Sequence, residues 1–252
     1  MTLVLPPGFV HCGFEVIDST NDEAKRQAAA GAADSTLITA RAQTHGRGRQ
    51  GRSWISGTGN VLCSLILRPA CPPRLAAQLS FVTALAVADA LRPLLPSAIP
   101  IALKWPNDVL VAGRKVSGIL LESATTPEGR LDWLVIGVGI NVADGPGDTA
   151  VGVALADLGV TASADDVIER FGAAFATWQD RWRRDGFAPI RAAWLAQAYG
   201  RHEPVTTTLG QQKLTGRFLD LDPDGGLVLE LAEGGRRTIA GGEVYFPSTP
   251  TA

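Results

Sequence analysis

Cysteine is scarce in this sequence, and no secretion signal or membrane span is evident in it. Cys12, Cys63 and Cys71 are too few and too widely spaced for a disulfide framework or a Cys-x-x-Cys metal site, and they fit a reducing compartment. The start, Met1 to Val10, has no basic region ahead of a long apolar run, which excludes a signal peptide. No apolar run reaches the length of a membrane span. We therefore expect a cytoplasmic protein with no membrane partner and no metal held by protein ligands alone.

Acidic residues are missing from a long region, Ser35 to Ala88, although the chain as a whole is nearly neutral. It carries 25 Asp and Glu against 23 Lys and Arg, for a formal net charge of −2. That balance argues against a general nucleic-acid-binding surface, so positive charge in the acid-free region is a local feature. With 252 residues, of which 46% are hydrophobic and 19% charged, the chain can bury a sizeable core.

The acid-free region contains a segment rich in glycine and arginine, residues 43–54, Gln-Thr-His-Gly-Arg-Gly-Arg-Gln-Gly-Arg-Ser-Trp, which we call the arginine loop. Its glycines let the backbone approach a ligand closely and turn several N–H groups toward one anion. Arg47, Arg49 and Arg52 add positive charge that matches phosphate or carboxylate oxygens. The composition predicts an anion-binding loop for a nucleotide-like ligand. A solvated basic loop is the alternative.

The loop contains a Gly-x-Gly-x-x-Gly motif, Gly46 to Gly51, which in dinucleotide-binding proteins opens a helix and is followed about 20 residues later by an acid. Here the next residues, 53–60, are rich in Ser and Gly and predict turns instead of a helix. No acid occurs in the required window. The context therefore excludes the dinucleotide-binding interpretation.

Hydrophobic patterning predicts strands mixed with a few helices over the first 200 residues. The predicted strands are residues 14–17, 37–42, 60–68 and 132–142, with two or three more between 102 and 122, and the predicted helices are 23–31, 74–91, 163–184 and 188–199. From about Arg201 the pattern changes to short alternating runs separated by turns. This change predicts a small C-terminal β-barrel of about fifty residues.

Two polar segments lie at the start of a predicted helix and at a predicted turn between strands. Residues 18–21, Asp-Ser-Thr-Asn, predict a helix N-cap that leaves two or three hydroxyl and amide groups for a ligand. Residues 104–108, Lys-Trp-Pro-Asn-Asp, are followed by a second short strand with Lys115. For Asp108 a turn-stabilising carboxylate is the structural alternative, and for Lys115 a solvent-facing strand residue.

Glycine also interrupts the strand predicted for residues 132–142. Gly137 and Gly139 lie two residues apart and therefore face the same side of a sheet. A strand glycine weakens pairing unless something must pass close to it. The pair predicts close approach of a ligand or another backbone at this point.

In their order and spacing these segments resemble those of the biotin protein ligases, enzymes that attach biotin to a lysine of carrier domains. The similarity extends from about Phe14 to Tyr245 and is carried by residues 18–21, 46–54, 104–108, 115–122, 137–141 and 241–243. The resemblance implies an α+β fold, with a mixed sheet flanked by helices as in class II aminoacyl-tRNA synthetases, followed by an SH3-like β-barrel. It implies a catalytic domain over residues 1–200 and the barrel over residues 201–252.

The resemblance also implies a two-step reaction that uses ATP, Mg²⁺ and biotin. Biotin and MgATP give biotinyl-5′-adenylate, and a lysine of a biotin carboxyl carrier protein then takes the biotinyl group. The first step brings a carboxylate against a phosphate, so concentrated positive charge and preorganised donors suit it. Only about a dozen residues precede the first predicted strand, so the resemblance favours the monofunctional type, without a DNA-binding repressor domain. It leaves a homodimer open.

The matched residues take roles from the resemblance. Those implied to contact biotin are Ser19, Thr20, Asn21, Gln43, Arg47, Gly48, Arg49, Lys115 and Gly118. Those implied to contact ATP or the adenylate are Arg47, Arg49, Arg52, Trp54, Asn107, Asp108, Lys115 and Asn141. Arg49, Lys115 and Asp108 are the predicted catalytic residues, and Asp108 either orients or deprotonates the incoming lysine.

Two other functions compete with this one. A lipoate ligase or octanoyl transferase shares the core fold and also modifies a carrier lysine, but the complete arginine loop and the C-terminal barrel argue against it. A nucleotide-sensing or nucleic-acid-binding module could use the barrel, because fold alone does not settle function. In residues 201–252, however, Lys and Arg are outnumbered by Asp and Glu.

Overall fold

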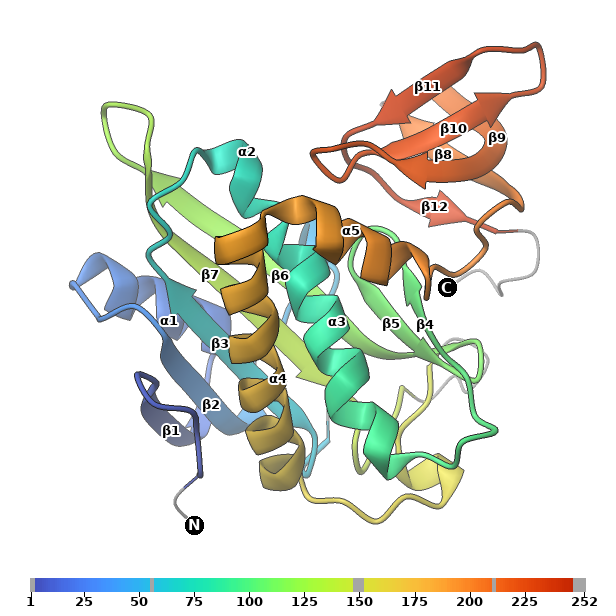
Figure 1. Cartoon of the computed structure of the whole chain (residues 1–252). Helices are drawn as coiled ribbons and strands as arrows, with labels where there is room; N and C mark the ends of the chain where they lie inside the picture. Colours follow the sequence, from blue (N-terminus) through green and yellow to red (C-terminus); the bar gives the residue numbers. More distant parts are fainter. Residues whose placement is uncertain (1–2, 55–56, 147–151, 210–211, 247–252) are drawn as a thin grey trace.

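The protein consists of a large mixed sheet with helices on both faces and a smaller antiparallel sheet beside it (Figure 1). This computed structural model describes residues 3–54, 57–146, 152–209 and 212–246. The smaller sheet is formed by the last part of the chain and lies against the end of the helical layer in Figure 1. The α+β class expected from the sequence is confirmed.

The large sheet has the strand order β1-β2-β3-β7-β6-β5-β4. Its strands are β1 (Val10–Ile17), β2 (Thr36–Gln43), β3 (Val61–Leu67), β4 (Ile101–Lys104), β5 (Asp108–Val111), β6 (Arg114–Thr125) and β7 (Leu131–Ile140). β1 and β2 pair in parallel because α1 crosses between them, and the other neighbours are antiparallel. This order brings β7 between β3 and β6, so residues far apart in the sequence become neighbours at the centre of the sheet.

Helices cover one face of this sheet and build the main core there. They are α2 (Pro73–Ala76), α3 (Leu79–Leu91), α4 (Ala164–Asp185) and α5 (Phe187–Leu195). α3 is buried nearly all round because it lies between the sheet and the other helices, so its sequence is apolar on every face (Figure 1). α4 is amphipathic and begins with a capping box between Ser163 and Asp166.

The other face of the sheet carries α1 (Thr20–Ala29). Ala24 and Ala28 of this helix pack on Ile38, Ile66 and Val135 in a second, smaller cluster of buried residues. Alanine at these helix positions lets α1 lie close to the strands, with its N-terminus against the middle of the sheet. The cavity described in the next section lies at that N-terminus.

The smaller sheet has the order β11-β10-β9-β8-β12, all antiparallel. Its strands are β8 (Pro204–Leu209), β9 (Gln212–Leu221), β10 (Leu227–Leu231), β11 (Arg236–Ile239) and β12 (Val244–Tyr245). The expected all-β unit is present, but in the described residues it is an open sheet with β11 and β12 at its edges. Its buried side chains, Phe218 among them, join the main core. Trp105 donates from Nε1 to the carbonyl of Gly225 at 3.0 Å, which ties the two sheets together.

Two sequence expectations need correction. The helix expected over residues 74–91 is broken into α2 and α3 by a turn at residues 77–78. Residues 73–94 are also long and apolar enough, by length and composition, to cross a membrane. In this fold 78% of that apolar window is buried inside the protein, as expected for a core helix.

Candidate active site

A cavity of about 380 Å³ opens where α1, the arginine loop and the small sheet meet the large sheet. All the residues that received a role from the sequence line it, namely Ser19, Thr20, Asn21, Gln43, Arg47, Gly48, Arg49, Arg52, Trp54, Asn107, Asp108, Lys115, Gly118 and Asn141. The structure therefore brings residues from five separate segments into one place. Its size and mixed lining suit a small organic ligand.

One end of the cavity is formed by the N-terminus of α1. Ser19 is the N-cap and its hydroxyl accepts from the N–H of Asp22 at 3.4 Å, which is a long bond. Gln43 Oε1 accepts from both the backbone N–H and the hydroxyl of Thr20, at 2.7 and 3.0 Å. The N-cap prediction is confirmed, and the Gln43 amide is fixed with its oxygen toward α1. The amide nitrogen of Gln43 is the group this arrangement leaves toward a ligand.

Glycines on β6 and β7 make room for two side chains in the cavity. Gly118 and Gly139 are opposite each other in the β6–β7 pairing, and the Trp54 indole lies over both. A Cβ at Gly139 would be 2.6 Å from Trp54 Cζ2, and a Cβ at Gly137 would overlap the Asn21 amide. The close approach predicted at Gly137 and Gly139 is thus made by side chains of the protein itself.

The arginine loop turns sharply at its centre, where Gln50 and Gly51 have φ of 56° and 74°. Within the loop the N–H of Gly48 donates to the carbonyl of Arg52 at 2.7 Å, and that of Trp54 to Gly46 at 2.9 Å. The N–H of Gly48 thus stabilises the loop itself instead of facing an anion, and anion binding by the other loop glycines stays a prediction. Among the described residues the next element after the loop is the strand β3 and not a helix, which agrees with the exclusion of a dinucleotide-binding motif.

The second half of the loop is held against the small sheet. Arg49 donates to Asn107 Oδ1 at 3.1 Å and to the carbonyl of Gly242 at 3.4 Å. Arg52 pairs with Glu243 at 2.7 Å. These contacts place Arg49 between the two sheets at the cavity wall. They also show that residues 241–243 complete the site.

Arg47 differs from the other two arginines because it faces carboxylates. Its NH2 group lies 2.5 Å from Asp22 Oδ1 and 3.2 Å from Glu122 Oε2. Lys25 pairs with the same two acids at 2.9 and 3.0 Å. Hydrogen bonds from Asn21 and Lys25 hold the pKa of Glu122 below its usual value, although burial of this carboxyl acts in the opposite direction. Glu122 is therefore charged at neutral pH.

Three charged side chains gather at the opposite end of the cavity. Asp108 Oδ1 lies 2.7 Å from Lys115 Nζ, and Asp108 is the register partner of Lys104 in the β4–β5 pairing. Burial lowers the pKa of Lys104, and the nearby Asp108 partly offsets this effect. Lys115 Nζ also lies 5.6 Å from the Trp54 ring centroid, within cation–π range. Two lysines around one carboxylate give this end a net positive charge.

Asn141 is buried and follows β7 directly. Its side chain donates to the carbonyl of Val153 at 3.3 Å, and its backbone N–H donates to Val116 at 2.8 Å. It thus joins β6 to the segment after residue 152 and lines the cavity at the same time. An adenine contact for Asn141 stays a prediction.

Several residues at the site were not predicted from the sequence. Lys104, Glu122, Ser64 and Glu243 belong to segments that the sequence singled out or predicted as strands, but no role was given to them. The strand–turn–strand pattern could have predicted that Lys104 is at the site, because Lys104 lies across the turn from Asp108. For Ser64, a fully buried hydroxyl in an apolar strand, the sequence offers none.

Comparisons with known proteins identify the family of this chain. The Biotin/lipoate A/B protein ligase family matches residues 13–141, and the biotin protein ligase C-terminal domain matches residues 203–246. The biotin–[acetyl-CoA-carboxylase] ligase of Paracoccus denitrificans is 41% identical over 236 residues, which cover 91% of this chain and 97% of that protein. The chain belongs to the biotin protein ligase family. It is therefore an enzyme, and the fold described above is that of a biotin protein ligase.

Other relatives extend this result. A bifunctional ligase/repressor of Bacillus subtilis is 35% identical over 231 residues, with 87% of this chain and 69% of that protein covered. The structure of the biotin protein ligase from Aquifex aeolicus in complex with biotin and ATP has a TM-score of 0.79 and 28% identity, covering 94% of this chain and 97% of that one. The first family groups biotin and lipoate ligases together, and the match to the biotin protein ligase C-terminal domain favours the biotin branch.

Proposed function

We propose that this biotin protein ligase activates biotin with MgATP to biotinyl-5′-adenylate and transfers the biotinyl group to a lysine of a biotin carboxyl carrier protein. The observation that carries the proposal is the cavity itself. It joins a rim of hydroxyl and amide groups, Ser19, Thr20 and Gln43, to a basic end with Arg49 and Lys115. A ligand with a polar ring at one end and a carboxylate at the other matches both. The relatives' names and the biotin and ATP bound to the Aquifex aeolicus ligase support the same assignment.

In the first step a carboxylate oxygen of biotin attacks the α-phosphorus of ATP, and the bond to the β-phosphate oxygen breaks to release pyrophosphate. Arg49 and Lys115 stabilise the negative charge that concentrates on the phosphate as the two anions approach. Lys104 adds a third positive charge beside them. Trp54, over the glycines of β6 and β7, offers a flat surface for the adenine.

In the second step the amine of the carrier lysine attacks the acyl carbon, and the bond between that carbon and the AMP oxygen breaks. The lysine must lose a proton to become a nucleophile. Asp108 is the carboxylate beside Lys115 at the reacting end, where it would orient the incoming ammonium group or accept its proton. Release of AMP completes the transfer.

Magnesium fits this site as an ion brought by ATP. Mg²⁺ in such sites takes one or two carboxylates and completes its shell with phosphate and water. In the described part of the chain no three His, Cys, Asp or Glu side chains cluster as a metal site, and Asp108 and Glu243 are the carboxylates at the cavity. Asp108 would hold the ion, and the bound ion would neutralise part of the phosphate charge.

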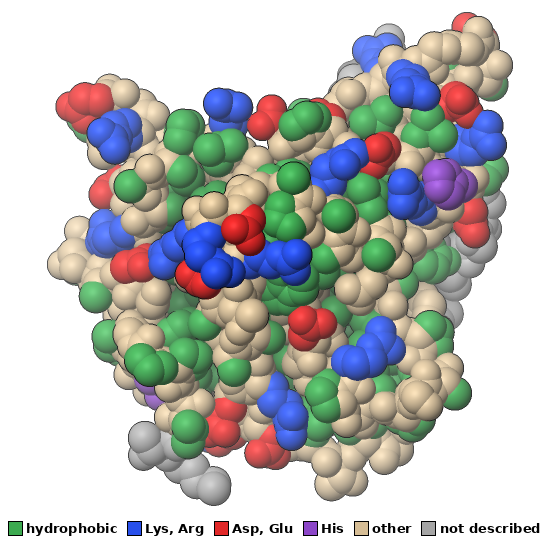
Figure 2. Space-filling view, viewed as in Figure 1, with side chains coloured by type: hydrophobic (Ala, Val, Ile, Leu, Met, Phe, Trp, Pro, Cys, Tyr) green, Lys and Arg blue, Asp and Glu red, His purple; other side chains and the backbone are tan. Residues whose placement is uncertain are grey.

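We also propose a division between a catalytic unit, residues 1–200, and a C-terminal unit, residues 201–252, in a cytoplasmic enzyme without a repressor role. The cysteines of the described residues are free, which suits a reducing compartment. On the face shown in Figure 2, basic and acidic side chains are interspersed, and the arginines near the end of α4 take part in ion pairs with Asp34 and Asp180. This pattern gives no support to DNA binding through that face.

Biotin-dependent ATP–pyrophosphate exchange tests the proposal. Biotin presents a ureido ring, whereas lipoate and octanoate have no groups to pair with the polar rim. Because a site built to hydrogen-bond its substrate rejects analogues by roughly 10⁴-fold in strong cases, exchange should be negligible with either acid. Gln43→Ala should raise the KM for biotin about tenfold, the equivalent of about one strong hydrogen bond, and change the KM for ATP less.

Gln27→Ala is the matched control, because Gln27 lies on α1 and bonds Glu23 away from the cavity. It should leave both KM values unchanged. Transfer to a carrier domain, followed by the mass of the product, tests the second step. Exchange that runs equally well with lipoate would overturn the biotin assignment and favour a lipoate ligase.

A further inference from the structure

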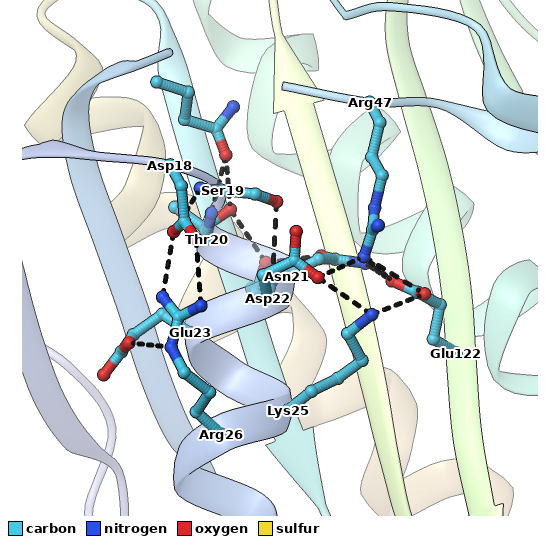
Figure 3. Close-up of polar contacts among 12 residues, drawn as sticks. Asp18, Ser19, Thr20, Asn21, Asp22, Glu23, Lys25, Arg26, Arg47 and Glu122 are labelled. Atoms are coloured by element: carbon cyan, nitrogen blue, oxygen red, sulfur yellow. Dashed lines mark hydrogen bonds and ion pairs between the residues drawn. The ribbon is translucent and has the colours of Figure 1, made fainter. Parts of the chain in front are cut away.

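Glu122 of β6 is the centre of a polar network that no substrate role explains (Figure 3). Its Oε2 accepts from Asn21 Nδ2 at 2.8 Å, and its Oε1 lies 3.0 Å from Lys25 Nζ. Arg47 of the arginine loop points to the same carboxylate, with its NH2 group 3.2 Å from Oε2. One side chain thus connects α1, β6 and the arginine loop, three elements that build the biotin end of the cavity.

Asp22 extends this network into a group of four charges, which we call the four-charge cluster: Asp22, Lys25, Arg47 and Glu122. Arg47 and Lys25 each contact both acids, so the two positive and two negative charges balance. The four side chains are only 27–35% exposed. Partial burial reduces screening by water and salt, and a network of this kind fixes geometry better than an isolated surface pair.

The network continues from Asn21 into the cavity. Ser64 Oγ lies 2.5 Å from Asn21 Oδ1 and 2.9 Å from Thr20 Oγ1, and Thr20 bonds Gln43. Ser64 and Asn21 are buried, so the positions of their polar groups are set by these partners. Gly137 leaves the space that the Asn21 amide occupies. A continuous path of polar contacts therefore runs from Glu122 to the residues proposed to bind the ureido ring.

We propose that Glu122 is a positioning residue for biotin, and this inference rests on the proposed function. It holds the Asn21 side chain, and through it Ser64 and Thr20, in the arrangement that receives the ureido ring. Through Arg47 it also fixes the first half of the arginine loop over that ring. The NH2 group of Arg47 is committed to carboxylates, so this arginine tethers the loop, while Arg49 and Lys115 supply the charge at the phosphate.

Kinetics of the Glu122→Gln variant test this role. Glutamine has the same shape and can still accept from Asn21, but it removes the charge that holds Arg47 and Lys25. We expect the KM for biotin to rise about five- to tenfold, as for loss of one or two partly exposed ion pairs, and the KM for ATP to change less than twofold. Calorimetric titration with biotin alone should show the same loss of affinity.

Arg26→Gln is the matched control. Arg26 lies on the same helix and pairs with Asp18 and Glu23, on the side of α1 away from Glu122 (Figure 3). It should leave both KM values unchanged. If the wild-type protein and this control show no biotin-dependent exchange, the proposed function fails; if they are active, the Glu122 result decides the inference alone.

A double-mutant cycle tests whether Arg47 acts through its ion pair with Glu122, as a tether of the loop, or binds an anion independently of Glu122. Because Glu122 and Arg47 act as one unit in this proposal, Glu122→Gln combined with Arg47→Gln should be no worse for biotin than Arg47→Gln alone. Three outcomes would overturn the proposal. The two substitutions could multiply in their effects on the KM for biotin, the KM for ATP could rise as much as that for biotin, or the Glu122→Gln enzyme could have unchanged kinetics. Should Glu122→Gln fail to fold, Glu122→Asp keeps the charge on a shorter side chain. A KM for biotin between wild type and Arg47→Gln would support the proposal, and a wild-type KM would refute it.

Discussion

Replacing Gly139 by alanine should damage catalysis without damaging the fold. A Cβ at this position would be 2.6 Å from Trp54 Cζ2 and 2.7 Å from its Nε1, against about 3.5 Å for carbon atoms in ordinary contact. The indole must therefore retreat by about 1 Å, and it can do so because it belongs to a surface loop. A displacement of that size at a reacting site can cost on the order of 10²-fold in rate. We expect a 10- to 100-fold loss, roughly, of biotin-dependent pyrophosphate exchange.

The free energy of unfolding of the Gly139→Ala variant should rise slightly or stay the same. Gly139 has ordinary strand geometry, and alanine in a strand is favoured over glycine by roughly 0.5–1 kcal/mol. For a protein of this size such a change moves the Tm by about 4 °C or less. Gly13→Ala on β1 is the control, because its Cβ would lie 3.3 Å from the end of the exposed His11 side chain and 3.5 Å from Thr39 Oγ1, without the overlap found at Gly139.

Exchange kinetics and a thermal melt on the same samples show whether Gly139→Ala impairs catalysis or the fold. Adding Trp54→Phe to Gly139→Ala should cost less than the product of the two single effects, because the smaller ring no longer meets the new methyl group. Full activity in Gly139→Ala would refute the argument that Trp54 must lie over the glycines. A large fall in Tm would show instead that the glycine serves the fold.

Two further predictions concern the charges at the reacting end. Arg49→Ala and Lys115→Ala should each reduce the adenylation rate, by on the order of 10²–10³ for a lost transition-state contact, while the Tm is retained; unchanged rates would return both residues to the role of solvent-facing charges. Burial lowers the pKa of Lys104 from its ordinary value of 10.5, so this side chain loses its charge at a lower pH than an exposed lysine does. The kcat/KM for ATP should therefore begin to fall below pH 10.5, and Lys104→Arg should shift that alkaline limb to higher pH. A limb that stays in place would exclude Lys104 from phosphate binding.

Much of the architecture followed from local patterns in the sequence. The N-cap at Ser19, the strands on either side of the arginine loop and the change to short β-strands after about residue 200 were each predicted from spacing and composition. All the residues assigned a role from the sequence motifs were found at one cavity. These features depend on residues close together in the chain, where backbone preferences and capping act directly.

The tertiary structure decided which side chains meet. Arg47 pairs with Glu122, Arg52 with Glu243 and Trp54 with Gly139, across separations of 75 to 191 residues in the first two cases. None of these partners has a local signature, because a charged side chain or a strand glycine looks the same in the sequence whatever lies opposite it.

The physical reason is the strand order of the large sheet. Placing β7 between β3 and β6 puts Gly137 and Gly139 against the N-terminus of α1 and the end of the arginine loop. Packing of the small sheet then brings Glu243 to the same loop. The sequence determined which groups are available for the chemistry. The sheet order determined that Arg47 faces two carboxylates while Arg49 lies between the two sheets.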